Sequence, residues 1–237
     1  MDLRVGIRAG DARYTGKYLP EVLSPALREW LNTAIRGGKI NQGFFQYQGS
    51  LAKNAAPTAS TLSLFFQVED AELAYQPGWP ALRSGAGAVF IDDQGVRVQL
   101  AKGQVLDSEV RNVSVNIPPA MNGGAVRLAL DGEVQSSVAD GLQILREAPL
   151  GVAPTFAGWQ GEGALSGRLK LDIPLAAGQT PLVQVDFATE QARLQISEPA
   201  LQLDNLKGAF RFNSATGLSA PDVRAQVFGR PVRAKIV

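Results

Sequence analysis

The sequence predicts a mainly β protein, built from many antiparallel strands and two short helices. Between 61 and 117, apolar residues such as Leu62 and Leu64 recur at every second position, mostly with polar residues between them. Turn-forming pairs such as Pro77-Gly78 and Asp92-Asp93 interrupt these runs. Period-two alternation broken by Gly, Pro and Asp is typical of half-buried strands joined by short turns. The same pattern elsewhere brings the expected total to about fourteen strands.

The N-terminal part begins with a strand at 1–9 and an irregular stretch at 11–20. A helix is predicted at 24–36, because Ser24 and Pro25 favour a helix start and Gly37-Gly38 favours a stop. Its apolar residues recur at helical spacing, as in a helix packed on a core. The alternative is a helix that lies over the mouth of the sheet.

The middle of the chain supplies a second helix and a candidate boundary. Ser136 or Ser137 is expected to cap a helix at 138–147, and Pro149 to end it. The glycine-rich stretch from 151 to 167 follows. We therefore divide the chain into a β section at 1–150, which contains both helices, and a continuing β section at 151–237.

The second section echoes the first. Gly208 and Leu194 each lie 121 positions after residues of matching context, Gly87 and Leu73. Self-similarity at a fixed offset is typical of modules that stack side by side. We expect the second section to be a partial internal repeat of 61–117.

Composition excludes several classes of function. The net charge is +1 with scattered Lys and Arg, so no basic patch indicates a nucleic-acid partner. The chain has no cysteine and no histidine, which removes disulfides, thiolate sites and Ser-His-Asp catalysis. It shows neither a signal peptide nor a run of 18 apolar residues. We expect a section of a longer protein, with any targeting segment or anchor outside it.

No residue pattern indicates an enzyme. The carboxylate pairs Glu69-Asp70 and Asp92-Asp93 consist of adjacent residues, whose side chains point apart in a strand or turn. The glycine run that starts at Gly161 lacks the lysine and the spacing of a phosphate-binding loop. No catalytic residue, metal site or cofactor is expected.

The apolar side of so many strands must be covered. Two sheets could cover each other as a sandwich. Alternatively, one sheet could curl along its axis and leave its hollow side for an apolar ligand. Alternation of residues is compatible with both arrangements.

Several blocks of sequence resemble the YhdP family of large AsmA-like proteins, over nearly the whole chain. These blocks are Tyr18-Leu-Pro20, Leu23-Ser-Pro25 through Leu51, Tyr75-x-Pro77-Gly78-Trp79-Pro80-x-Leu82, Ile173-Pro174-Leu175, Asn205-Leu206-x-Gly208-x-Phe210-x-Phe212 and Val227-Phe228-Gly229-x-Pro231-Val232. The resemblance implies a bridge-type lipid transfer protein of the Gram-negative envelope. Such a protein is periplasmic and anchored to the inner membrane. Its long curled sheet has a hydrophobic groove that carries phospholipid between the inner and outer membranes.

We therefore expect a taco-like curled sheet whose partners are phospholipid acyl chains, the membrane through regions outside this chain, and other envelope proteins. The alternative is a closed sandwich that acts as a structural or interaction module without a lipid path. The predicted lipid-binding residues all come from alternating strand positions: Leu64, Phe66, Val68, Val89, Ile91, Val98, Leu128, Leu130, Leu171, Val185, Phe187, Phe210, Phe212 and Val227.

Overall fold

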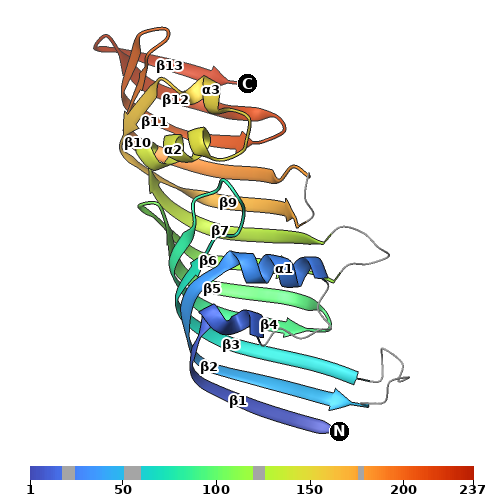
Figure 1. The fold of residues 1–237 in the computed structure, drawn as a ribbon. Coiled ribbons are helices and arrows are strands. Elements are labelled where there is room, and N and C mark those ends of the chain that lie inside the picture. Colours follow the sequence, from blue (N-terminus) through green and yellow to red (C-terminus); the bar gives the residue numbers. More distant parts are fainter. Residues whose placement is uncertain (18–24, 51–59, 120–125, 176–178) are drawn as a thin grey trace.

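The part of the chain that the structure describes forms one antiparallel β-sheet of 13 strands that does not close on itself. The computed structural model describes residues 1–17, 25–50, 60–119, 126–175 and 179–237. Figure 1 shows the strands stacked one beside the next, with the N-terminus at one end of the stack and the C-terminus at the other. The strand order is β1-β2-β3-β4-β5-β6-β7-β9-β10-β11-β12-β13, and β8 also pairs with β10.

Most strands are long, and the helices are few and short. The strands are β1 (Asp2–Asp11), β2 (Ile35–Gly49), β3 (Ser60–Leu73), β4 (Leu82–Asp92), β5 (Gly95–Val105), β6 (Ser108–Ile117), β7 (Arg127–Ser137), β8 (Trp159–Glu162), β9 (Ala164–Pro174), β10 (Leu182–Ile196), β11 (Leu201–Asn213), β12 (Gly217–Val227) and β13 (Arg230–Ile236). The helices are the 3₁₀-helix η1 (Ala12–Lys17) and the α-helices α1 (Pro25–Ala34), α2 (Val138–Glu147) and α3 (Ala153–Phe156). The mainly β prediction is confirmed, with 13 strands in place of about fourteen.

The second helix lies where the sequence predicts it, and the first helix ends early. Ser137 caps α2, and its side-chain oxygen accepts a hydrogen bond from the Asp140 backbone N–H at 3.1 Å. The predicted stop of α1 at Gly37-Gly38 is wrong, because α1 ends at Ala34 and the next residue already belongs to β2. Gly38 has a φ of +140° inside that strand, where a Cβ would lie 3.1 Å from Ala71 Cα. Ser24 lies outside the described residues.

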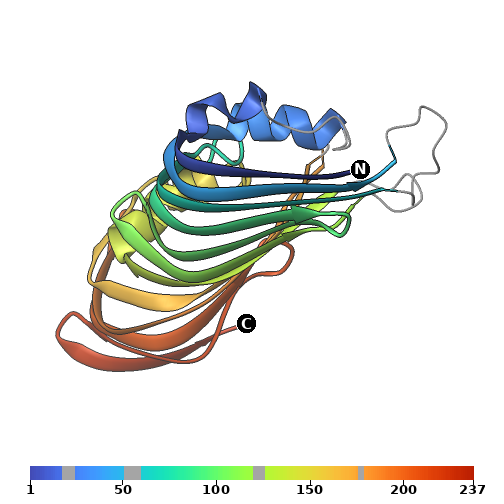
Figure 2. The same cartoon turned by 90° about the horizontal axis from the view of Figure 1, so that it is seen from below.

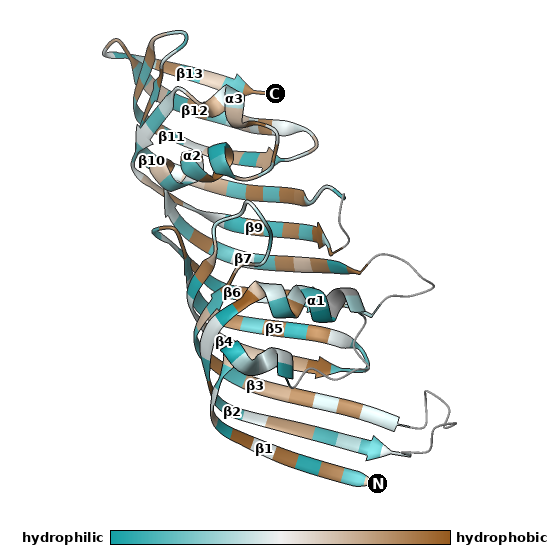
Figure 3. Cartoon of the chain, viewed as in Figure 1, coloured by the Kyte–Doolittle hydropathy of each residue, from teal (hydrophilic) through white to brown (hydrophobic). Residues whose placement is uncertain are grey.

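The two faces of the sheet differ in polarity. Cross-strand neighbours such as Val89, Val98 and Val115 pair directly with one another and share the apolar face. The opposite face carries exposed ion pairs, for example Arg168 with Asp131 at 2.6 Å. Figure 3 shows the resulting alternation of hydrophobic and hydrophilic residues along the strands. Exposed pairs of this kind add little stability, so burial on the apolar face is the main stabilising contribution.

A line of irregular strand pairing, which we call the crease, crosses the sheet. Asp70, Ser84, Asn112 and Asn205 each have a positive φ of about 50°, and the strand registers shift beside them. Such bulges bend strands and increase their twist. Asn and Asp reach the left-handed region more readily than most residues do. Figure 2 shows that all the strands of the stack curve in the same sense.

Both ten-residue helices lie on the apolar face. Leu31 of α1 is buried in one cluster with strand residues such as Leu64 and Ile117. Val138 and Leu142 of α2 belong to a second cluster on the same face. Among the described residues, no second sheet faces the first, so the structure is not a sandwich.

Candidate functional site

A row of half-buried apolar side chains runs across the strands from β3 to β12. Each member is half-buried, whereas the clusters on either side of the row are buried. We call this row the half-buried band, and its members are Phe66, Val89, Val98, Val115, Leu130, Leu169, Val185, Phe212 and Leu218. No member is polar.

Strand register aligns the members of the band in two runs, one on β3–β7 and one on β9–β12. Phe66 pairs with Val89, and the pairing passes through Val98 and Val115 to Leu130. Leu130 itself pairs with Leu171, so the row shifts by two residues along β9 to Leu169, on the same face. From Leu169 the pairing passes through Val185 and Phe212 to Leu218. The band crosses from β3 to β12, which at a strand spacing of about 4.8 Å corresponds to roughly 40 Å.

Two glycines allow neighbouring strands to pack closely beside the band. At Gly43 a Cβ would lie 2.8 Å from the Phe66 ring, and at Gly167 it would lie 2.9 Å from Phe187 Cβ. Gly43 therefore leaves room for the Phe66 ring, and Gly167 leaves room for the backbone of β10, since a Cβ there would also lie 2.3 Å from the Asp186 carbonyl oxygen. Substitution at Gly43 would displace the ring, and substitution at Gly167 would displace the neighbouring strand.

An aromatic layer, which we define as Trp30, Tyr75 and Trp79, shares a buried cluster with most of the band. All three pack against the same buried cluster as Leu31. The Trp30 Nε1 donates a hydrogen bond to the Tyr75 carbonyl at 2.9 Å, and the Tyr75 and Trp79 ring centroids are 6.4 Å apart. Burial raises the pKa of the Tyr75 phenol to about 12, so this side chain is neutral at any physiological pH.

The second helix is fixed to the sheet by a buried carboxylate. Asp140 is 7% exposed and accepts hydrogen bonds from the Ser108 hydroxyl at 2.6 Å and the Asp107 backbone N–H at 3.1 Å. The Ser108 hydroxyl also lies 2.7 Å from that of Ser136. These bonds connect α2 to the β5–β6 turn. They satisfy the carboxylate, so the group has a structural explanation and need not be part of a reactive site.

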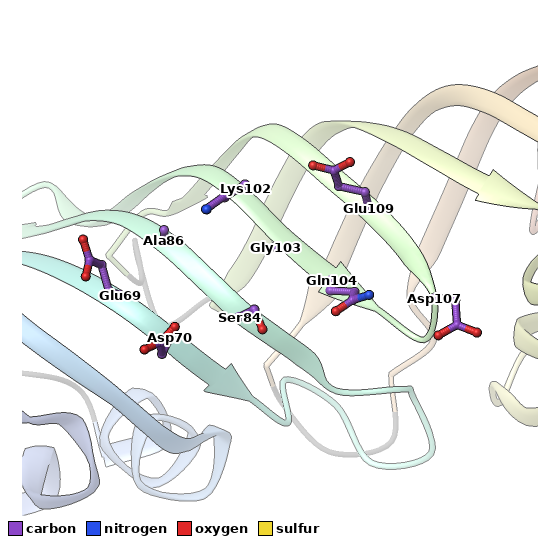
Figure 4. A pocket seen from close by; sticks show the side chains of 9 residues that line it. All are labelled: Glu69, Asp70, Ser84, Ala86, Lys102, Gly103, Gln104, Asp107 and Glu109. Atoms are coloured by element: carbon purple, nitrogen blue, oxygen red, sulfur yellow. The ribbon is translucent and has the colours of Figure 1, made fainter.

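A pocket of about 560 Å³ lies on the polar face, along the crease. Figure 4 shows its lining, in which Glu69, Asp70, Lys102, Asp107 and Glu109 carry charge. Hydrogen bonds from Lys39 and Arg111 hold the pKa values of Asp70 and Glu109, respectively, below their ordinary range. These carboxyl groups of the pocket are therefore charged, and a lining of charged side chains is unsuitable for an acyl chain.

The described residues hold no cluster of acidic or other ligating side chains suited to a metal ion. Within the described ranges, none of the helices combines the length and the apolarity needed to cross a bilayer. The model of the family described as YhdP protein matches residues 1–237. This chain belongs to the YhdP family. No curated protein and no solved structure matches it.

Membership of the YhdP family confirms the resemblance and places the chain in a family of the Gram-negative envelope. It is a transport family rather than an enzymatic one, and membership is consistent with lipid transfer.

All fourteen predicted lipid-binding residues of this YhdP-family chain lie on the apolar face. Half-buried positions hold Phe66, Val68, Val89, Val98, Leu130, Val185, Phe187, Phe212 and Val227. Buried positions hold Leu64, Ile91, Leu128, Leu171 and Phe210. The half-buried residues leave part of their side chains accessible, whereas the buried ones lie in the core of the same face. Val227 lies apart from the band, beside the β12–β13 turn, where it pairs with Arg230.

Sequence reasoning missed three members of the band: Val115, Leu169 and Leu218. Each belongs to an alternating run on the same face as a residue that was predicted, so periodicity alone could have identified it. The aromatic layer was harder to find, since Tyr75 and Trp79 precede and follow a turn and meet α1 only in the folded chain.

Proposed function

We propose that this chain is a section of a bridge-like protein that carries phospholipid across the periplasm between the inner and outer membranes. Acyl chains lie on the half-buried band while the polar headgroups stay in water. In the full-length protein, regions outside this chain provide the anchor in the inner membrane. The observation that carries the proposal is an apolar band that crosses nine strands of a single sheet, which no second sheet covers among the described residues.

The energetics require a surface of this kind. Each methylene removed from water contributes about 0.8 kcal/mol. Transfer of the tails of a phospholipid with about 30 methylenes from a bilayer to water therefore costs a free energy on the order of 20 kcal/mol. An apolar band that follows the stack of strands offsets this cost at every position, so a lipid can move along it without catalysis.

The proposal assigns passive roles to the side chains. Phe66, Val98 and Leu130 offer flexible or flat apolar surface without polar atoms, so they favour no position along the acyl chain. Continuity of the surface is therefore expected to matter more than any single residue. A charged side chain in the band interrupts the path, because a buried carboxylate without a partner is strongly unfavourable.

Substitution within the band tests this function. We expect Phe66→Asp and Val98→Asp to reduce co-purified phospholipid at least about tenfold, as measured by mass spectrometry of organic extracts. Matched controls are Gln67→Asp and Gln99→Asp, which place the same charge one residue away on the exposed polar face. Thermal unfolding identifies variants that remain folded.

Folded band variants that retain the wild-type lipid content would refute the proposal. An interaction module without a lipid path would give that result, since it depends on the edges of the sheet and not on the band. Loss of lipid from the control variants as well would indicate a general effect of charge and would also count against the band.

A further inference from the structure

Two buried nitrogen atoms in the described part of the chain have no hydrogen-bond acceptor, Arg28 Nε and Trp79 Nε1. An unpaired buried donor destabilises a protein by about 1–3 kcal/mol, and native structures contain few of them. Both atoms are donors, and both lie on segments that cover the apolar face. Two uncommon features in one layer suggest an acceptor supplied by a ligand.

Trp79 contrasts with its neighbour in the aromatic layer. The Trp30 indole N–H donates to the Tyr75 carbonyl at 2.9 Å, whereas the Trp79 indole N–H is buried and unpaired. The Trp79 ring packs against the buried cluster of the apolar face. An indole in this position presents one donor beside apolar surface, which suits an oxygen atom attached to an apolar ligand.

Arg28 lies on the inner side of α1. It precedes Leu31 by one turn, and Leu31 is buried in the cluster of the apolar face, whereas Glu29 and Asn32 are exposed. Arg28 itself is half-buried and belongs to no ion pair in the described part of the chain. Among the described residues, its guanidinium group therefore has no carboxylate partner.

The two segments form one layer. The Ala74 N–H donates to the Ala34 carbonyl at 2.7 Å, which joins the end of α1 to the start of the β3–β4 connection. The Trp30–Tyr75 hydrogen bond is a second link between them. Arg28 and Trp79 thus belong to a single structural unit, in which Trp79 packs against the buried cluster that most of the band also contacts.

We propose that this unit binds the anionic, oxygen-rich end of an amphiphile whose acyl chains lie on the half-buried band. The proposal rests on the proposed function and adds a polar binding point to the apolar path. The guanidinium group pairs with a phosphate or carboxylate, and the indole N–H donates to a phosphate or ester oxygen. The phosphate of a phospholipid and the carboxylate of a fatty acid share this chemistry.

Binding of defined lipids to the purified 237-residue chain tests the proposal. The probes are dioleoylphosphatidylglycerol, oleate, neutral dioleoylglycerol, and the purely apolar fluorophore diphenylhexatriene. We expect Arg28→Met and Trp79→Phe each to weaken phosphatidylglycerol binding about tenfold, since a hydrogen bond to a charged group contributes roughly 1.5–3 kcal/mol. Diphenylhexatriene binding is expected to remain at the wild-type level.

Matched variants separate this role from general effects. Arg36→Met removes an exposed arginine two residues past the end of the same helix, and Trp159→Phe removes an indole far along the chain. Both are expected to bind every probe as the wild type does. Arg28→Lys retains the charge and is expected to recover part of the phosphatidylglycerol affinity. Comparison of phosphatidylglycerol with oleate shows which anion is the better ligand.

The outcomes are distinct. Wild-type affinity for both anionic probes in Arg28→Met and Trp79→Phe would overturn the inference and leave the proposed function intact. Equal loss of phosphatidylglycerol and diphenylhexatriene would also overturn it, since this result indicates disturbed packing. Equal loss of phosphatidylglycerol and dioleoylglycerol in Arg28→Met would overturn the assignment of the charge. A wild-type chain that binds neither the anionic probes nor diphenylhexatriene would refute the proposed function, and the inference with it.

Discussion

The ribbon β3–β6 and the ribbon β10–β13 share a backbone plan and differ in what they place on it. Phe66 pairs with Val89 in the first, and Phe187 pairs with Phe210 in the second, at positions 121 residues later. The register shift after Val68 recurs after Thr189, also 121 residues later. Pairing and irregularity thus repeat together.

The strained positions repeat as well. Ser84 and Asn205 have the same φ of 50° and lie 121 residues apart. Leu106 lies in the β5–β6 turn with a φ of 55°, and Phe228 lies in the β12–β13 turn with a φ of 50°. These two residues are 122 positions apart, so the second ribbon has one extra residue before this turn. A left-handed backbone at non-glycine residues is unfavourable, so its recurrence favours a common plan over coincidence.

The side chains on the polar face follow no such rule. Phe65 and Phe90 pack with ring centroids 5.1 Å apart in the first ribbon, whereas Asp186 and Arg211 form an ion pair at the corresponding positions of the second. Alternation and turns are common to both ribbons, so these features determine the fold. The identity of an exposed cross-strand pair is free to change.

The largest expected difference between the ribbons is the loss of stability when a side chain on the apolar face is shortened. Phe210 is buried and stacks on Phe187 at 5.1 Å, so Phe210→Ala is expected to lower the free energy of unfolding by about 3–4 kcal/mol. Val89, its counterpart, is half-buried, and Val89→Ala is expected to lower it by about 1 kcal/mol. Urea denaturation measures both. Equal losses would show that the two walls are packed alike.

The second largest expected difference concerns the corresponding glycines Gly87 and Gly208, which differ in their distance from the next strand. A Cβ at Gly87 would lie 2.2 Å from the Gln99 carbonyl oxygen, whereas a Cβ at Gly208 would lie 3.1 Å from that of Asp222. Gly87→Ala therefore requires β5 to move and is expected to lower the free energy of unfolding by about 2–3 kcal/mol. For Gly208→Ala we expect a loss within about 1 kcal/mol. Thermal unfolding of both variants checks this order, and the reverse order would contradict the difference in backbone spacing.

Transfer of the ion pair into the first ribbon tests the freedom of the polar face. Phe65→Asp alone is expected to lower the free energy of unfolding by about 1–2 kcal/mol, because the carboxylate would lie between Phe44 and Phe90. Addition of Phe90→Arg is expected to restore about 0.5 kcal/mol through the new cross-strand pair. A double-mutant cycle measures this coupling. A coupling of zero or of opposite sign would show that the two ribbons present different polar surfaces.

The smallest expected effect is a dependence on pH that only the second ribbon shows at this position. The hydrogen bond from Arg211 lowers the pKa of the Asp186 carboxyl from its ordinary value. A group with a lowered pKa stabilises the folded state above its unfolded pKa, about 3.9 for Asp, and loses this contribution as the pH falls through the folded value. We expect Asp186→Asn to be less stable than the wild type at pH 7, with a difference that shrinks below about pH 4. A difference that is constant from pH 7 to pH 3 would refute the assignment.

Local chemistry made much of this fold predictable. Alternation assigned the apolar face, and the second helix was predicted at 138–147 from a serine cap and a proline stop, the bounds that the structure has. The stop at Gly37-Gly38 failed because a glycine pair marks either a helix end or a close approach of backbones. Here Gly38 lies against Ala71 of the next strand. Only the pairing of β2 with β3 decides between these roles.

The crease was not predictable from periodicity. A bulge inserts one residue and shifts the register, and Asp70, Ser84 and Asn112 are polar residues that an exposed strand position accepts equally well. Likewise, the depth of each apolar residue depends on curvature. Phe66 and Leu64 are two residues apart on one face, yet the first is half-buried and the second buried.

Along the main path of the sheet, each strand bonds to the strands next to it in sequence, apart from the short insertion that carries α2, α3 and β8. Contacts of this kind resemble those of a stacked solenoid, in which each unit is stabilised by its immediate neighbours. Opening of the structure should then proceed inward from the two terminal strands, and amide protons should exchange fastest in β1 and β13 and slowest near the centre of the stack.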